Sequence, residues 1–520
     1  MNRTIAINKL KTEEHWDIIV IGGGSTGLGI AVDAAKRGFK TLLLEKNDFA
    51  KGTSSRSTKL IHGGVRYLAQ GNIKLVIEAL RERGFMLANA PHLTRVQHFI
   101  IPAYSFFLKW FYGIGLFMYD FLSRKLSLGR PVFLSKQAVL KKLPVIQSKG
   151  LKGGILYADG QFDDARMAIA LAMTADDLGA TVVNYVQVTK LLKEDNKIIG
   201  VLAEDELKGE VFSLKARVVI NATGVFADSI LDMDDPAEPA MVMPSQGVHL
   251  VVDHSFFPGN DALMIPKTKD GRVLFALPWH GKVVIGTTDT ALNIINEEPI
   301  ALEEEIEFIL MHFNEYATTK ISRKDVLSVF AGLRPLVKTS NQTSTSLASR
   351  DHTIIVSKSN LITITGGKWT TYRKMAKDAV NNATFVAKLP IVKCTTRNLK
   401  LHGYTTSLRY GDKYSSYGAD AATIIEMQRN QPALSEPIHP KYDYCLAELI
   451  FAVQYEMAMT VEDILARRSR LLFIDARAAI EAAPMVAEKM AKLLNEDQQW
   501  QEEQLSSFFV TASGFVALKS

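Results

Sequence analysis

The fold of this chain is decided by one stretch near its start, Asp17-Ile18-Ile19-Val20-Ile21-Gly22-Gly23-Gly24-Ser25-Thr26-Gly27. The stretch predicts an apolar strand and a glycine turn, followed by a helix over 28–37, a second strand over 41–44 and the acid Glu45. Gly22 permits the tight turn, Gly24 lets backbone amides approach a pyrophosphate, and Gly27 lets the helix pack closely on the strand. The helix N-terminus favours phosphate charge, and Glu45 can accept hydrogen bonds from a ribose. The chain is therefore predicted to hold a dinucleotide on a Rossmann-like unit.

Length and composition limit the class of protein. A chain of 520 residues is too long for one ordinary core, so we expect two or three domains. The 61 basic and 55 acidic residues leave a net charge of only +6, which does not favour a nucleic-acid partner. The two cysteines, Cys394 and Cys445, form no metal-binding or redox motif. We therefore expect no disulfide framework, no metal site and a reducing compartment.

A second glycine turn lies late in the chain. The strand predicted over 361–365 runs into Gly366-Gly367-Lys368, and a helix follows from Thr370. Before it, strands are predicted over 181–192 and 211–214, and a buried strand over 216–220 ends in Asn221-Ala222-Thr223-Gly224. An NAD enzyme normally has no need of the late turn, whereas a longer cofactor with an isoalloxazine at its far end does. The pattern favours FAD, bound by a domain that is discontinuous in sequence.

Isolated polar residues in apolar surroundings mark a candidate substrate pocket. They are Arg66 in His62-Gly63-Gly64-Val65-Arg66-Tyr67, His249 at the head of an apolar strand, Arg334 before a proline, and Lys368 at a helix N-terminus. Each has a purely structural alternative, such as a core histidine with satisfied hydrogen bonds at His249 or a surface arginine in a tight turn at Arg66. Together the three cations suit a phosphorylated substrate.

The segment 99–130 is unusually aromatic and ends in basic residues. Pro102 and Lys109 interrupt it, so it is too short in uncharged residues to cross a membrane. Two interpretations remain open: a buried helix of a second domain, or a helix that lies in a membrane interface with its apolar face toward the lipid.

The chain closely resembles the FAD-dependent glycerol-3-phosphate dehydrogenases. The matching motifs are IGGGSTGLGIAVDAAKRG, TSSRSTKLIHGGVRYL, INATGVFAD, GRVLFALPW with IGTTDT, FAGLRPL, ITITGGKWTTYRKMA and, in the C-terminal part, MTVEDILARRSRLLFIDARAA. The resemblance covers about residues 15–480.

The resemblance implies an α/β (α+β) fold in three domains. A Rossmann-like FAD-binding domain is expected over 1–90, 152–235 and 341–390. An antiparallel-sheet substrate domain is expected over 91–151 and 236–340, with a possible membrane contact. A helical cap domain is expected over 391–520.

The resemblance also implies the activity: oxidation of sn-glycerol 3-phosphate at C2 to dihydroxyacetone phosphate, with hydride transfer to FAD and electrons passed to a quinone. The substrate pocket is then lined by Arg66, Tyr67, His249, Arg334 and Lys368. His249 is the first choice for the proton acceptor and His62 the second, because a neutral imidazole can take a proton near pH 7. The implied FAD contacts are Gly22, Gly24, Ser25, Thr26, Gly27, Glu45, Lys46, Thr53, Ser54, Ser57, Ala222, Thr223, Gly224, Gly366, Gly367, Lys368 and Thr370.

The electron acceptor and location follow from finer features of the resemblance. Related oxidases carry a longer insertion between GLRPL and GGKWTTYR. The short interval here, together with the aromatic and basic segment 99–130, favours a quinone-reducing enzyme attached peripherally to an anionic membrane. No D-x-D-x-D-G loop follows the cap domain, so calcium control is not expected. The expected location is the cytoplasmic face of a bacterial inner membrane, or the cytoplasm, and a homodimer is possible. The alternatives are a flavin oxidase of the same fold, using oxygen or acting on an amine or amino acid, and a flavin-bearing sensor without turnover.

Overall fold

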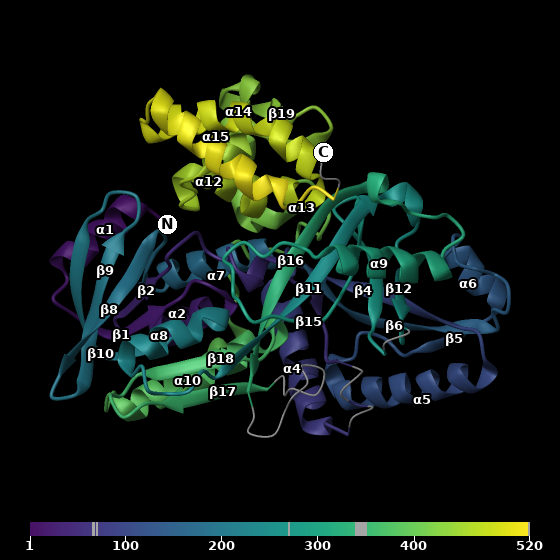
Figure 1. Ribbon diagram of the computed structural model, residues 1–520, viewed down its shortest axis with the longest axis horizontal. Helices are drawn as coiled ribbons and strands as arrows, with labels where there is room; N and C mark the ends of the chain where they lie inside the picture. The colour runs from purple at the N-terminus through teal and green to yellow at the C-terminus, as the bar shows by residue number, and fades with distance from the viewer. Residues whose placement is uncertain (65–67, 69–70, 269–270, 339–350, 518–520) are drawn as a thin grey trace.

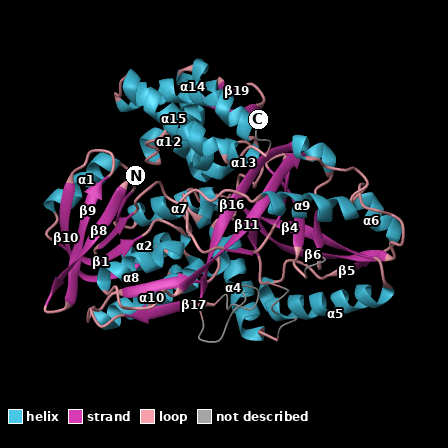
Figure 2. Cartoon of the chain, viewed as in Figure 1, coloured by secondary structure: helices cyan, strands magenta, loops and turns pink. Residues whose placement is uncertain are grey.

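The computed structural model describes residues 1–64, 68, 71–268, 271–338 and 351–517, which form two sheets with surrounding helices and a C-terminal helical group (Figures 1 and 2). The first sheet contains the strand and glycine turn that open the chain. Its strands follow the order β17-β18-β10-β1-β2-β7. Their bounds are β1 His15–Ile21, β2 Thr41–Leu44, β7 Thr181–Val183, β10 Val211–Asn221, β17 His352–Val356 and β18 Ile362–Gly366.

The first sheet is parallel at its centre. β1 pairs in parallel with β2 and β10, and β10 pairs in parallel with β18. Helices α2 (Ser25–Lys36), α7 (Asp164–Asp177) and α10 (Tyr372–Val386) pack together over it. Because helices cover a parallel sheet, its strands read as continuous apolar runs, as β1 does. α1 (Arg3–Thr12) and α8 (Ala227–Asp234) complete this part of the molecule.

Two predicted strands have different limits in the structure. The strand expected over 181–192 breaks at Tyr185, whose φ is 56°, and continues as β8 (Val186–Glu194). The two strands expected over 211–214 and 216–220 are one strand, β10. Its first half pairs antiparallel with β9 (Lys197–Asp205) and its second half pairs with β1. One strand thus belongs to both a hairpin and the parallel sheet, which the local sequence pattern cannot show.

The second sheet is mostly antiparallel. Its order is β15-β11-β14-β13-β12-β4-β6-β3, with β16 beside β11 and β5 beside β6. The bounds are β3 Leu60–Ile61, β4 Thr94–Ala103, β5 Val132–Leu134, β6 Gly153–Phe162, β11 Val242–Asp253, β12 Ala262–Ile265, β13 Leu274–Trp279, β14 Lys282–Gly286, β15 Thr290–Ala291 and β16 Val326–Val337. Helices α4 (Ile73–Asn89), α6 (Lys136–Lys142) and α9 (Glu303–Tyr316) accompany it. The predicted fold class is confirmed. β3 and β6 join this sheet although the predicted boundaries assign them to the first domain; those boundaries stay a prediction.

The C-terminal group is mostly helical and lies above the two sheets in Figure 1. It contains α11 (Ala421–Asn430), α12 (Leu446–Tyr455), α13 (Leu471–Ile474), α14 (Ala476–Leu494) and α15 (Gln498–Ser513), with a small hairpin of β19 (Pro437–His439) and β20 (Tyr442–Cys445). One apolar core joins it to the second sheet, since Trp279 and Phe330 cluster with Leu472 and Phe473. The group is therefore packed onto the body of the protein through shared core residues.

The aromatic segment forms α5 (Phe106–Ser123), on the opposite side of the molecule from the C-terminal helices (Figure 1). Gly113, Leu116, Tyr119 and Ser123 are its buried residues. Its large apolar side chains face outward: Phe107 is 75% exposed, Trp110 59% and Phe121 81%. The interpretation of this segment as a buried helix is therefore wrong. In the described part of the chain, no helix has the length and apolar character needed to cross a membrane.

Candidate active site

A cavity of about 520 Å³ lies where the two sheets meet, within the size range of ligand sites. It is lined by both glycine turns and by residues of the second sheet. Of the residues predicted to contact cofactor or substrate, the lining includes Gly22, Gly24, Ser25, Thr26, Glu45, Lys46, Thr53, Ser54, Ser57, His62, Ala222, Thr223, Gly224, His249, Arg334, Gly366, Gly367, Lys368 and Thr370. Gly27 lies behind this lining. Arg66 and Tyr67 lie outside the described residues.

The first glycine turn is shaped by close backbone contacts. Gly22 has a φ of +110°, and a Cβ on Gly27 would lie 1.9 Å from the carbonyl oxygen of Gly22. Gly24 is the N-cap of α2 and offers no side chain to its first amides. One of these, the N–H of Ser25, donates to Oγ of Ser54 at 2.9 Å. The other N–H groups at the start of α2 form the kind of anion site that a pyrophosphate uses.

Glu45 ties the first turn to the end of β2. Its Oε2 accepts the N–H of Gly23 at 2.5 Å, and its Oε1 accepts the N–H of Asn47 at 2.8 Å. Burial raises the pKa of Glu45 above its ordinary value, and these two backbone hydrogen bonds offset only part of the rise. Each carboxylate oxygen keeps a second lone pair, so Glu45 can hold the turn and still accept from a ribose. Lys46 lies at a more exposed position and donates to Glu297 at 2.7 Å.

The second glycine turn follows β18. Gly366 and Gly367 have φ values of +79° and +74°, and Cβ atoms there would meet Asp351 and Met375. Oγ1 of Thr365 donates to the carbonyl of Gly224 at 3.1 Å, which joins this turn to the one after β10. Thr370 meets the backbone of His62, whose N–H donates to Oγ1 at 3.3 Å. Two turns and an uncapped helix start, all on one cavity, fit a cofactor that is longer than a mononucleotide.

His249 lies on β11 with its ring buried, 2% exposed, and stacked on Phe330 at 4.8 Å between ring centroids. Its Nε2 lies 2.9 Å from Oγ1 of Thr58. Burial first, and then the charges of Lys59 and Arg334, hold the pKa of His249 well below its ordinary value. The imidazole is therefore neutral near pH 7 and can accept a proton.

Arg334 lies on β16, directly opposite Ser245 of the neighbouring β11. Its guanidinium donates to the carbonyls of Gln246 at 3.2 Å and Thr288 at 3.0 Å, and lies 3.5 Å from Asp289. These contacts fix the fork beside the cavity. A Cβ on Gly247 would lie 2.3 Å from Nη2, so the glycine makes room for the guanidinium.

A buried charge cluster beside His249 was not predicted. Lys59, fully buried, donates to Asp164 at 2.8 Å and to the carbonyl of Ser55 at 2.7 Å, and Arg470 donates to the same carboxylate at 3.0 Å. Burial lowers the pKa of Lys59, Asp164 raises it and Arg470 lowers it, with a result of about 7. Lys59 is part of the TSSRSTKLIHGGVRYL motif, but the other charged residues of the cluster, Asp164 and Arg470, lie more than 100 residues away along the sequence. The local pattern therefore carries no signal for the cluster.

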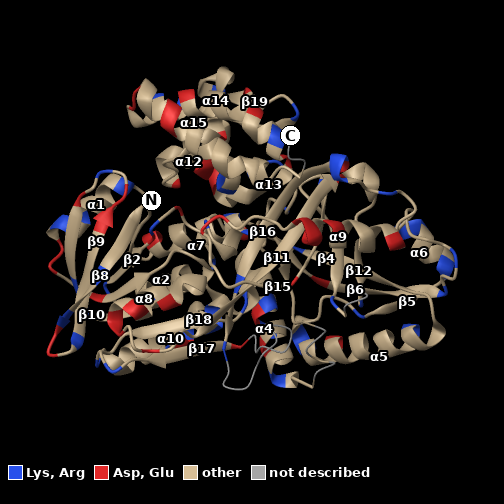
Figure 3. Ribbon diagram, in the orientation of Figure 1, with Lys and Arg blue, Asp and Glu red and all other residues tan. Residues whose placement is uncertain are grey.

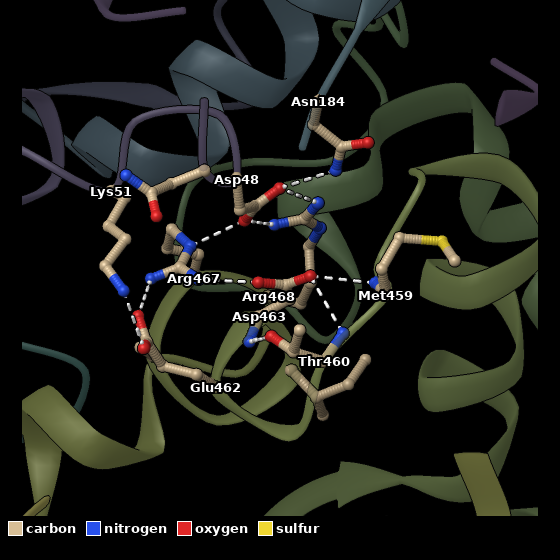
Figure 4. Close-up of polar contacts among 12 residues, drawn as sticks. Asp48, Lys51, Asn184, Met459, Thr460, Glu462, Asp463, Arg467 and Arg468 are labelled. Atoms are coloured by element: carbon tan, nitrogen blue, oxygen red, sulfur yellow. Dashed lines mark hydrogen bonds and ion pairs between the residues drawn. The ribbon is translucent and has the colours of Figure 1, made fainter. Parts of the chain in front are cut away.

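A second buried network holds the loop after Glu45 to the C-terminal group (Figure 4). Asp48 accepts from Arg467 at 2.5 Å and from Arg468 at 2.7 Å. Burial raises the pKa of Asp48, but the two arginines lower it more, so the pKa falls below its ordinary value. Glu462 bridges Arg467 and the cavity-lining Lys51. The arginines lie on a π-helix (Asp463–Arg468), a form of helix that is common at functional sites.

Comparison with known proteins agrees with this geometry. The family model for FAD dependent oxidoreductases matches residues 17–373. The model for the C-terminal domain of alpha-glycerophosphate oxidase matches 362–504. The fold, the cavity and the first match define the chain as an FAD-dependent oxidoreductase, with FAD as its cofactor.

Similar individual proteins narrow the class. The mitochondrial glycerol-3-phosphate dehydrogenase of Homo sapiens is 39% identical over 97% of this chain and 74% of its own length. The probable mitochondrial enzyme of Dictyostelium discoideum is 40% identical over 94% and 83%. The glycerol-3-phosphate dehydrogenase from Bacillus halodurans, solved with FAD, is 29% identical, with a TM-score of 0.81 over 100% of this chain and 98% of that one. The chain belongs to the family of FAD-dependent glycerol-3-phosphate dehydrogenases, as its motifs predicted.

Proposed function

We propose that this enzyme oxidises sn-glycerol 3-phosphate at C2 to dihydroxyacetone phosphate and delivers the electrons to a membrane quinone. The observation that carries the proposal is one cavity that joins two glycine turns to His249 and Arg334. These two residues come from neighbouring strands, β11 and β16, whose pairing fixes their spacing. When bound, FAD supplies the two-electron chemistry that no side chain can perform.

The residues divide into three roles. The FAD contacts are those predicted in the glycine turns, at Glu45 and Lys46, and in the segment 53–57. Arg334 and Lys368 receive the phosphate, because a half-buried guanidinium and a cation beside a helix N-terminus both suit an anionic group. His249 accepts the proton of the C2 hydroxyl, with His62 as the second candidate. Arg66 and Tyr67 stay predicted substrate contacts.

α5 gives the proposed contact with the membrane. Its outward face is apolar and aromatic, and Lys109 and Asp120 are the only charged residues in its sequence (Figure 3). Exposed Arg124, Lys125 and Arg130 follow it. Aromatic residues favour the membrane interface, and basic residues are attracted to anionic lipid.

The buried side of α5 reaches the active-site loop. Oη of Tyr119 accepts the N–H of Gly63 at 2.7 Å, next to the cavity-lining His62. A membrane contact through α5 would therefore bring lipid-dissolved quinone to the side of the protein that carries this loop. The proposed location is the cytoplasmic face of a bacterial inner membrane, with peripheral attachment, and a homodimer stays a prediction.

The test uses the FAD-loaded enzyme under anaerobic conditions. Glycerol 3-phosphate should bleach the flavin absorbance, and a soluble quinone should restore it. Amines and amino acids should leave it unchanged. Bleaching by an amino acid in place of glycerol 3-phosphate would overturn the substrate assignment. Faster reoxidation by dissolved oxygen than by quinone would overturn the electron acceptor and favour an oxidase.

A further inference from the structure

The loop that follows β2, residues 46–56, forms one wall of the cavity. Most of it lines the cavity, and it contains several of the proposed FAD contacts. Its backbone also meets both glycine turns. The N–H of Ala50 donates to the carbonyl of Gly23 at 3.0 Å, and the ring N–H of Trp369 donates to the carbonyl of Ser54 at 2.8 Å. The shape of this loop therefore sets how well the cavity fits a cofactor.

Lys51 joins this loop to two other parts of the molecule. Its Nζ donates to Oε2 of Glu462 at 3.0 Å and lies 3.5 Å from Oε1 of Glu298. Glu462 belongs to the C-terminal group, where it directly precedes the π-helix (Figure 4). Glu298 lies between β15 and α9, in the part of the chain that forms the second sheet. We call these three side chains the Lys51 clasp, because they join the loop, the C-terminal group and the second sheet at one point.

The Lys51 clasp is ionised near neutral pH. Burial lowers the pKa of Lys51, but Glu462 and Glu298 raise it more, so the pKa lies above its ordinary value. Burial raises the pKa of Glu462, but Arg467 and Lys51 lower it more, to about 2. All three side chains of the clasp are mostly buried, so water and salt screen their attraction less than that of a surface ion pair.

Each carboxylate of the clasp has a second cationic partner. Oε1 of Glu462 accepts from Arg467 at 2.6 Å, and Oε2 of Glu298 accepts from Arg56 at 2.5 Å. Lys51 can therefore be replaced by a neutral residue without leaving a buried carboxylate unpaired, which would cost far more than the loss of one ion pair. A substitution of Lys51 thus weakens the hold on the loop while the fold is kept.

The C-terminal group acts on the cavity from outside it. Among the described residues that line the cavity, none belongs to this group. It nevertheless holds the loop at two points, since Arg467 and Arg468 bind Asp48 and Glu462 binds Lys51. A loop that is already ordered in the free protein removes the cost of ordering it from the free energy of binding.

We propose that the Lys51 clasp keeps the loop 46–56 in the shape that binds FAD, so that the C-terminal group strengthens FAD binding without touching the cofactor. Lys51, Glu298 and Glu462 are positioning residues in this role. The inference rests on the proposed binding of FAD along this loop. By linkage, FAD in turn stabilises the contact between the loop and the C-terminal group.

The first test measures the release of FAD from the holoenzyme, followed by the rise in FAD fluorescence after dilution. Lys51→Met should release FAD roughly 5- to 20-fold faster than the wild type, a loss between those of an exposed ion pair and a buried charge-assisted hydrogen bond. Glu462→Gln should act in the same direction but less, roughly 3- to 10-fold, because Lys51 keeps Glu298. Glu210→Gln, which breaks an exposed pair with Lys11, is the matched control and should release FAD at the wild-type rate.

The direction of the Glu462→Gln effect separates the clasp from a direct contact. If Lys51 instead binds the anionic cofactor itself, Glu462→Gln frees the ammonium for FAD, and release slows or stays at the wild-type rate. That result would overturn the clasp. In the double variant, Lys51→Met with Glu462→Gln, release should be no faster than in Lys51→Met alone, because the shared contact is already lost. Losses that add in the double variant would mean that the two residues act separately, against the proposal.

The second test compares hydrogen exchange in the apoenzyme and the holoenzyme and needs no turnover. FAD should slow exchange in the loop 46–56 and also in the π-helix, whose residues do not line the cavity. In Lys51→Met, the protection of the π-helix by FAD should shrink. If FAD leaves exchange in the loop unchanged, FAD binds elsewhere and the proposed site is wrong. If FAD protects the loop but not the π-helix, the site stands and the clasp is wrong.

Discussion

Replacing three aromatic residues of α5 with serine should release the enzyme from anionic membranes. The residues are Phe106, Phe107 and Trp110, which are 63%, 75% and 59% exposed. Since little of their surface packs against the protein, the substitutions should leave the fold intact. The variant therefore separates the membrane contact from the stability of the enzyme.

The size of the effect follows from the exposed surface. Fully burying a large apolar side chain is worth about 1.5–3 kcal/mol, so burying the exposed two-thirds of each ring is worth about 1–2 kcal/mol. The three together give about 3–6 kcal/mol, or roughly a 10²- to 10⁴-fold change in partitioning. Each basic residue near the lipid, such as Arg124 or Lys125, adds about 1 kcal/mol. Salt should weaken binding only in part, because it screens charge and not the apolar contact.

The assay is flotation with vesicles of anionic lipid, paired with two activity measurements. The variant should leave the vesicle fraction and should slow reduction of quinone dissolved in the vesicles, while reduction of a soluble dye stays normal. The matched control changes Phe385, Ile391 and Val510 to serine, which are 86%, 97% and 74% exposed and lie outside α5. It should float as the wild type does. If the α5 variant floats normally, or if both triple variants are released equally, α5 is not the docking element.

Three further predictions concern the cofactor, the substrate and pH. Acid precipitation should release FAD into the supernatant, because the glycine turns hold it without a covalent bond; flavin in the pellet would contradict this. Arg334→Ala and Lys368→Ala should each lower kcat/KM for glycerol 3-phosphate by about 10- to 150-fold, since a charge-assisted hydrogen bond is worth about 1.5–3 kcal/mol. Activity on glycerol should hardly change, and equal losses on both substrates would point to a structural role. His402, between Asp420 and Asp177, has its pKa raised to about 9 by those partners. Its folded pKa is above the unfolded one, so its stabilisation is complete below about pH 6.5 and is lost as pH rises through about 9. His402→Gln should remove roughly 1–3 kcal/mol from the free energy of unfolding at pH 6 and much less at pH 10, as measured by denaturant titration.

The parts of the fold that could be predicted are those whose cause is local. A glycine with a positive φ at Gly22, an apolar strand before it and an acid at Glu45 leave a signature within 30 residues. His249 and Arg334 stood out because a polar group in an apolar run is costly without a partner.

Other parts depend on contacts between distant segments. The sequence around Thr58 does not indicate its contact with His249, 191 residues further on. The sequence around Lys59 likewise does not indicate its ion pair with Asp164. The exposure of α5 was equally hidden, because an apolar helix has the same sequence pattern whether protein or lipid covers it. The prediction divided β10 into two strands. In the structure it is one strand whose first half pairs with β9 and whose second half pairs with β1.

The order of the first sheet has a consequence for how the protein is made. β1 leaves the ribosome early, but its neighbour β10 begins at Val211 and the next strand, β18, at Ile362. At about 5–20 residues per second, the two glycine turns are synthesised roughly 20–70 s apart. For the first roughly 10–40 s of that interval one edge of β1 lacks its partner β10. Asp48 lacks the arginines that balance its charge until residue 468 is complete. Productive capture of the cofactor therefore waits until the second glycine turn has been synthesised, and the nascent first half of the chain is the stage at which chaperones have most to protect.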